Sequence, residues 1–101
     1  LYLVPGMGHC ALGGGATNFS TSTRNSMPLV ADADHDMSLA LERWVEEGVA
    51  PRRIVAARYR GSTPASGVEL TRPLCPYPAV PVYDGRGDPA LASSHQCRPP
   101  T

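Results

Sequence analysis

The chain has 101 residues, and its nine basic and nine acidic side chains cancel to a formal charge of zero. A chain of this length forms one small domain at most and buries a modest share of its surface. No basic cluster extends beyond Arg52-Arg53, so the sequence predicts no nucleic-acid partner. No apolar run approaches the roughly 20 residues that cross a bilayer, so it predicts no membrane partner either.

The first residues have the pattern of a strand. Leu1-Tyr2-Leu3-Val4 alternates aliphatic and aromatic side chains and stops at Pro5-Gly6, which is typical of a short buried strand followed by a turn. Because the chain begins with this strand pattern rather than with methionine, we expect it to be the C-terminal piece of a longer protein.

Residues 11 to 35 are rich in Gly, Ser, Thr and Asn and show no regular period, so they are predicted to form loops with Phe19 as the one apolar anchor. The glycine triplet at 13–15 is not a phosphate-binding loop, because neither a Lys-Ser/Thr pair nor a helix follows at the required spacing.

One helix is predicted, from Asp36 to Glu47. Asp36 can accept backbone hydrogen bonds at a helix start, and Gly48 can take the positive-φ conformation that ends a helix, with Pro51 preventing continuation. Apolar residues at spacings of three and four predict that one face, which includes Trp44, packs in the core. These residues are Leu41, Trp44 and Val45.

Arg53 to Tyr59 is β-branched and aromatic enough for a strand or extended segment along the edge of the core, ended by Gly61 and Pro64. Beyond Thr71, prolines at 73, 76, 78, 81 and 89 remove backbone donors, which excludes a central strand. The sequence therefore predicts an extended, edge-like tail held by its apolar side chains, Tyr77, Val80, Val82 and Tyr83.

The three cysteines are Cys10, Cys75 and Cys97, and an odd number in an oxidising compartment implies a partner elsewhere or a free thiol. Cys75 and Cys97 lie in a proline- and glycine-rich segment that can bury few apolar side chains, so a disulfide is the natural way to hold it. The bridge would close a loop of about 22 residues and contribute about 3 kcal/mol. The alternative is three reduced thiols in a cytosolic protein.

The candidate catalytic residue is His9, which follows the strand pattern in a glycine-flanked turn, Pro5-Gly6-Met7-Gly8-His9-Cys10. Glycines allow backbone angles that other residues resist and leave space beside the imidazole. A histidine of near-neutral pKa on a fixed loop suits general-base work, in which it takes a proton from an attacking hydroxyl and returns it to the leaving group. The alternative is an ordinary polar residue in a tight bend.

Residues 5–10 resemble the histidine motif of the tannase and feruloyl esterase family, whose members are serine esterases with an α/β-hydrolase core. The likeness continues through residues 41–51, which are similar to the family's helix with its Trp-Val-Glu and Gly-x-Ala-Pro ending. It reaches residues 72–78, Arg-Pro-Leu-Cys-Pro-Tyr-Pro, which resemble the family's closing segment. The pattern after that segment is matched by Tyr83, Gly85, Gly87, Asp88 and Cys97.

The resemblance implies an α/β fold in which residues 1–101 are the C-terminal part of an α/β-hydrolase catalytic domain. This part would hold the last strand, the histidine loop, one helix and an extended tail with a disulfide. His9 would be the triad histidine, Cys10 would pair with a cysteine beside the nucleophilic serine, and Cys75 would pair with Cys97. Because the nucleophile, the acid and the lid lie upstream in the family, the piece alone is expected to be inactive.

The resemblance also implies a secreted or periplasmic enzyme whose substrate is a small-molecule ester of a phenolic or aromatic acid. In the family a calcium ion is associated with the lid, but no carboxylate cluster in this chain resembles its site, so no cofactor is expected here. His9, Cys10, His35 and His95 match no zinc spacing, so no metal is expected, and His35 and His95 are predicted to lie at the surface.

This chain departs from the family before the helix, where residues 20–35 form a longer link than the family's short one. We interpret it as a loop insertion near the site, either solvated or shaping substrate entry; loops tolerate insertion at small cost. Two other readings stay open: a small non-catalytic secreted module with one disulfide, and a parent protein that keeps the fold but has lost its serine.

Overall fold

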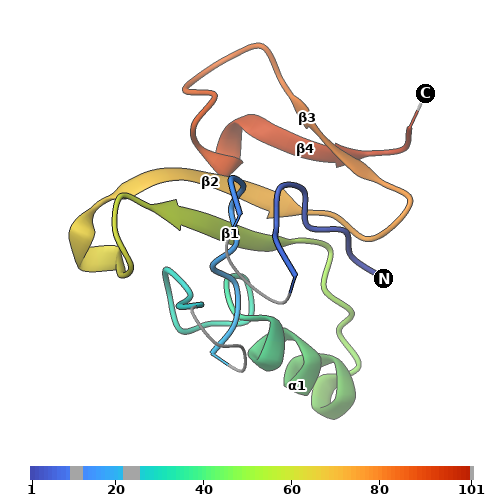
Figure 1. Cartoon of the computed structure of the whole chain (residues 1–101). Helices are drawn as coiled ribbons and strands as arrows, with labels where there is room; N and C mark the ends of the chain where they lie inside the picture. Colours follow the sequence, from blue (N-terminus) through green and yellow to red (C-terminus); the bar gives the residue numbers. More distant parts are fainter. Residues whose placement is uncertain (10–12, 22–25, 101) are drawn as a thin grey trace.

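The computed structural model describes residues 1–9, 13–21 and 26–100. They form a small unit of mixed helix and sheet, in which two antiparallel pairs, β1–β2 and β3–β4, are the named sheets. Figure 1 shows the β1–β2 pair between α1 and the β3–β4 pair. In chain order the elements are α1 (Met37–Glu47), β1 (Ile54–Tyr59), η1 (Pro64–Ser66), β2 (Val68–Leu74), β3 (Val80–Tyr83), η2 (Ala92–Ser94) and β4 (His95–Arg98).

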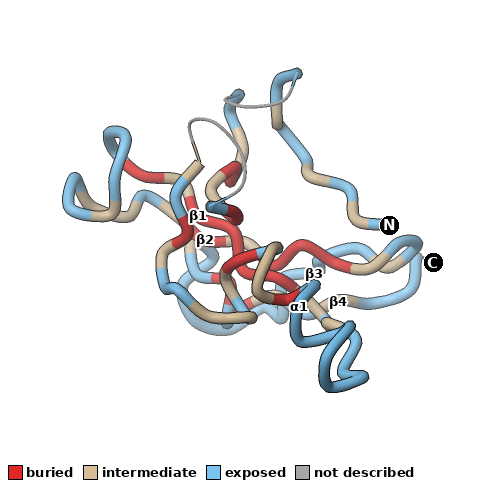
Figure 2. The backbone as a smooth tube through the Cα atoms, turned by 90° about the horizontal axis from the view of Figure 1, so that it is seen from below, coloured by how far each residue is buried: buried red, intermediate tan, exposed pale blue. Residues whose placement is uncertain are grey.

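The core lies around β1. Ala56 and Ala57 are completely buried, and the buried segments in Figure 2 gather along β1 and β2. The expectation that this strand packs along the edge of the core was therefore wrong, because β1 is covered on both faces. The buried cluster around it consists of Ala16, Phe19, Ala40, Ile54, Ala56 and Leu74, with Tyr2, Val4, Met7 and Leu70 packed against it.

Helix α1 begins and ends where its capping residues predict. The Asp36 carboxylate accepts the Ser38 amide at 2.9 Å and the Thr21 hydroxyl at 3.0 Å, although Asp36 is only 2% exposed. At the other end Gly48 adopts φ +70° and its N–H bonds to the Trp44 carbonyl. Both ends thus satisfy backbone groups that a helix leaves unpaired.

The predicted apolar face of α1 does not lie in the core of this unit. Trp44 is 51% exposed and Val45 is 77% exposed, and Leu41 and Met37 are exposed as well. The helix touches the core through Ala40, its one buried residue. The prediction that Trp44 packs in the core was wrong for the described residues, because helical spacing identifies an apolar face but not what covers it.

The predicted strand over Leu1 to Val4 was also wrong. Within the part of the chain that the structure describes, this segment pairs through an isolated bridge between Tyr2 and Pro76 and a bond from the Tyr77 amide to the Leu1 carbonyl at 2.7 Å, and it forms no strand. The partner segment contains Pro76 and Pro78, which lack an N–H, so a longer ladder cannot form. Leu1, at 82% exposed, and Leu3 remain on the surface.

The tail contains more regular structure than predicted. β2 pairs with β1 from Leu74 to Val68, and Pro73 sits opposite Val55 in that register, in keeping with proline's confinement to edge strands. β3 and β4 form a second pair. These pairings join residues far apart in the sequence, which local proline content does not reveal.

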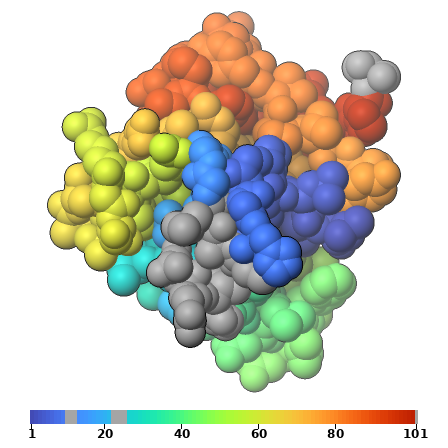
Figure 3. Space-filling model, viewed as in Figure 1, coloured from blue at the N-terminus to red at the C-terminus, as the bar shows by residue number. Residues whose placement is uncertain are grey.

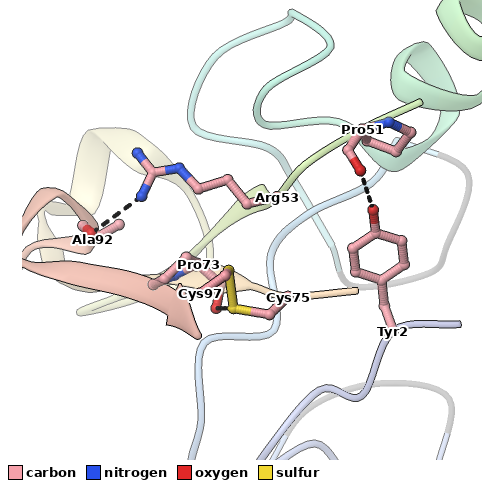
Figure 4. The surroundings of a disulfide bond; sticks show 7 residues. All are labelled: Tyr2, Pro51, Arg53, Pro73, Cys75, Ala92 and Cys97. Atoms are coloured by element: carbon pink, nitrogen blue, oxygen red, sulfur yellow. Dashed lines mark hydrogen bonds between the residues drawn. A yellow bond between two sulfur atoms is a disulfide. The ribbon is translucent and has the colours of Figure 1, made fainter. Parts of the chain in front are cut away.

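The Cys75–Cys97 disulfide is present in the structure, with Cα atoms 5.5 Å apart. Figure 4 shows it between the end of β2 and β4, close to the segment that carries Arg53. Thr71 adds two further contacts to the tail: its amide bonds to the Ala90 carbonyl at 2.8 Å, and its hydroxyl accepts the Ala92 amide at 2.7 Å. The tail is therefore fastened to β2 covalently and by hydrogen bonds.

Replacing Asp36 with alanine should lower the free energy of unfolding by about 2 kcal/mol, because the Ser38 amide and the Thr21 hydroxyl would lose their acceptor in a buried place. The matched control is Asp84→Ala, since Asp84 also accepts a backbone amide, that of Arg86, but at an exposed turn. Urea unfolding should show a clearly smaller decrease in the free energy of unfolding for Asp84→Ala than for Asp36→Ala. Equal losses would refute the importance of burial at Asp36.

Removing the disulfide by the double change Cys75→Ala and Cys97→Ala should lower the free energy of unfolding by about 3 kcal/mol, because the open chain gains entropy when a loop of sequence separation 22 is released. Denaturant unfolding measures this loss. Either single variant opens the same loop and should be destabilised to a similar extent. A double variant as stable as the parent would contradict the role given to the bridge.

Candidate active-site loop

His9 lies on an exposed loop that begins at the Pro5–Gly6 turn. Gly6 adopts φ +76°, a conformation that side-chain-bearing residues rarely take. Met7 packs against the core cluster, and its amide bonds to the Val4 carbonyl at 3.4 Å. One residue of the loop is thus fixed to the core, while the imidazole two residues later lies on the surface, where a reacting group can reach it.

The glycine triplet packs directly against this loop. The Gly15 amide donates to the Gly6 carbonyl at 3.0 Å. A Cβ at Gly15 would lie 2.1 Å from the Pro5 carbonyl oxygen, and one at Gly13 would lie 2.1 Å from the Gly6 carbonyl oxygen and 2.7 Å from the Gly8 nitrogen. In Figure 3 the dark-blue first residues and the lighter-blue glycine segment touch on the face toward the viewer. Only residues without a side chain allow this approach.

The segment after the triplet is fixed to β1. The Asn18 amide donates to the Ala57 carbonyl at 3.0 Å, the Ala57 amide donates to the Asn18 carbonyl at 3.0 Å, and the Asn18 side chain donates to the same Ala57 carbonyl at 3.0 Å. Phe19 follows and is buried. The position of the histidine loop therefore depends on β1, through residues 13–19.

The sequence missed one residue of this site. Arg58, in β1, donates from its guanidinium to the carbonyls of Gly13 and Gly14 and forms an ion pair with Glu69 at 2.9 Å. A single cation inside the otherwise apolar run Ile54–Tyr59 was the available signal. Its contacts with Gly13 and Gly14 could not be predicted, because these residues lie 45 and 44 positions away in the sequence.

The other predicted site residues lie apart from this loop or outside the described part. Cys10 is outside the described residues, so its pairing stays a prediction. His35 bonds to Asp32 at 2.7 Å through Nδ1, and this hydrogen bond lowers the pKa of the Asp32 carboxyl. His95 bonds to the Pro89 carbonyl at 2.8 Å and contacts the Tyr83 ring. Both histidines are half-buried rather than fully at the surface.

The described residues contain no group of three or more His, Cys, Asp or Glu side chains that could hold a metal ion. Within residues 1–9, 13–21 and 26–100, no helix is long and apolar enough to cross a membrane.

Comparison with known proteins finds esterases and a related hydrolase among the proteins that this chain resembles. An uncharacterized esterase of Xanthomonas campestris pv. campestris is 45% identical over 97 residues, covering 96% of this chain and 17% of that protein. A mono(2-hydroxyethyl) terephthalate hydrolase of Piscinibacter sakaiensis is 41% identical over 101 residues, covering 99% of this chain and 14% of that protein. The crystal structure of an esterase from Aspergillus oryzae matches with a TM-score of 0.80 at 34% identity, covering 92% of this chain and 18% of that one.

The fold of this chain thus resembles one part of a solved esterase structure. A family model for tannase and feruloyl esterase matches residues 1–98, and the chain belongs to the tannase and feruloyl esterase family. It spans less than a fifth of the length of the relatives above, at 14% to 18%.

Replacing Gly15 with alanine should disrupt the histidine loop, because the new Cβ would lie 2.1 Å from the Pro5 carbonyl oxygen. Gly14→Ala is the matched control, since the nearest atom to its Cβ is Arg58 Nη1 at 3.9 Å. Hydrogen–deuterium exchange at the amide of residue 15 should accelerate about tenfold or more in Gly15→Ala and stay near the parent rate in Gly14→Ala. Equal rates in the two variants would show that the close packing is not needed.

Proposed function

We propose that residues 1–101 are the C-terminal part of the α/β-hydrolase catalytic domain of a serine carboxylic ester hydrolase. The substrates proposed are small-molecule esters of phenolic or aromatic acids. The family assignment over residues 1–98 supports an ester hydrolase. Terephthalate, in the name of one relative, is an aromatic acid, which supports the substrate class.

The single observation that carries the proposal is the exposed His9 on a loop whose backbone is fixed by glycine packing and by β1. A general base must be placed within hydrogen-bond reach of the hydroxyl that it deprotonates, and small displacements are costly in rate. His9 would accept the serine proton as the hydroxyl attacks the ester carbonyl, and then donate it to the leaving alkoxide.

The exposed face of α1 supports the proposal that this chain is part of a larger domain. Contiguous apolar surface on a folded unit generally marks a place where another part of a protein packs. Here the surface consists of Met37, Leu41, Trp44 and Val45. In the proposed domain, segments outside this chain would cover it and would carry the nucleophile, the acid and the lid.

Cys10 has a defined role in the proposal. A disulfide from Cys10 to a cysteine beside the nucleophilic serine would join the residues next to serine and histidine. Such a bridge would hold two loops, distant in sequence, at the short range that proton transfer requires. Mass mapping of the intact protein tests this pairing directly.

The proposed reaction uses proton transfer by His9 and needs no cofactor from this chain. A calcium ion is proposed only for the lid, outside residues 1–101. A secreted or periplasmic location is proposed on the basis of the Cys75–Cys97 disulfide, since such bonds persist in oxidising compartments.

In the full-length protein, His9→Ala should lower kcat for hydrolysis of a model gallate or ferulate ester by roughly 10³-fold or more, because the serine would lose its base. The matched control is His95→Ala, which removes an imidazole from the β3–β4 pair and should keep activity near the parent level. Thermal unfolding checks that both variants fold. Full activity in His9→Ala would remove this imidazole from the mechanism, and an inactive parent protein would favour a non-catalytic module.

A further inference from the structure

The glycine segment that packs on the histidine loop is held by one side chain of β1. The Arg58 guanidinium bonds through Nη1 to the carbonyls of Gly13 and Gly14. The same guanidinium bonds through Nε to Glu69 of β2 at 2.9 Å. Two edges of one planar group are thus engaged, so the carbonyl-binding edge cannot rotate without breaking the ion pair.

Backbone contacts alone connect the Gly13–Gly14 segment to the histidine loop. Gly13 approaches Gly6 and Gly8 so closely that a Cβ would lie 2.1 Å from the Gly6 carbonyl oxygen and 2.7 Å from the Gly8 nitrogen. Gly8 is bonded directly to His9. A shift of residues 13–14 away from Arg58 would therefore leave space behind the residue that precedes the imidazole.

From this geometry we propose that Arg58 is a positioning residue for His9, with Glu69 fixing the orientation of its guanidinium. The inference rests on the proposed function, in which His9 transfers the serine proton. Arg58 acts through the Gly13–Gly14 carbonyls and touches neither the substrate nor the reacting atoms.

A purely structural role for Arg58 is less consistent with its surroundings. The side chains of Arg58 and Glu69 are 36% and 50% exposed, and ion pairs in such places contribute little to stability. The Asn18–Ala57 bonds and the buried Phe19 hold the following segment to the core independently of Arg58. Loss of Arg58 should therefore change the geometry of the loop more than the stability of the fold.

The test is the full-length protein with Arg58→Met, which keeps the length of the side chain but removes its donors. We expect kcat for a model ester to fall about 10- to 100-fold, with KM changed less than about threefold, because proton transfer and not binding is affected. Arg58→Lys keeps the positive charge but not the planar guanidinium that donates from two edges, so its kcat should lie between those of the parent and of Arg58→Met. Hydrogen–deuterium exchange at the Gly15 amide should accelerate, while the thermal midpoint stays close to that of the parent.

The matched control is Arg60→Met. Arg60 is two residues further along, and its side chain lies beside Gly67, where a Cβ would be 3.3 Å from Arg60 Cδ, so this change should leave kcat and Gly15 exchange unchanged. If Arg60→Met loses as much activity as Arg58→Met, the effect is one of general surface charge and the proposal is overturned. If His9→Ala is inactive while Arg58→Met has parental kcat and parental exchange, Arg58 has no positioning role. If His9→Ala keeps full activity, the proposed function fails instead, and the exchange measurement still decides whether Arg58 holds the glycine segment.

Discussion

The arrangement depends on one constraint, the close contact of two backbone segments with no side chains between them. Residues 13–15 lie so close to the Pro5–Gly8 turn that a Cβ at Gly13 or Gly15 would overlap with its backbone atoms. This contact has two costs: the glycines bury no side chain, and they lose more conformational entropy on folding than other residues do. In return, the backbone next to His9 is defined by direct contact and by the bond from Gly15 to Gly6, rather than by side chains that can change rotamer.

β1 carries this constraint into the core. Ala56 and Ala57 are completely buried, and the strand is fixed on one side by β2 and on the other by the bridge to Asn18. The small side chains of Ala56 and Ala57 allow the neighbouring segments to approach the strand closely. The same strand supplies the partly exposed Arg58, so one element supports the loop through both backbone and side-chain contacts.

Local chemistry was readable from the sequence, and long-range contact was not. The ends of α1 followed from Asp36 and Gly48, because a cap bonds to groups within a few residues. The glycine-hinged turn before His9 was visible for the same reason. The contact of Gly13 with Gly8 and the partners of Arg58 could not be predicted, since spacing does not say which loop returns to which strand. The pairing of β3 with β4 was missed because proline content describes each strand and not its partner.

The exposed face of α1 and the exposed imidazole of His9 have one explanation under the proposed function. Helical spacing correctly predicted that Trp44 and Val45 share one apolar face. The error was to expect that residues of this chain would cover that face, which is exposed. The backbone that leads to His9 is likewise held by the described residues, while the groups with which His9 would react are proposed to lie outside the chain. The described residues thus hold the backbone that leads to His9 by their own contacts, and the two exposed features are the ones that the proposed domain would complete.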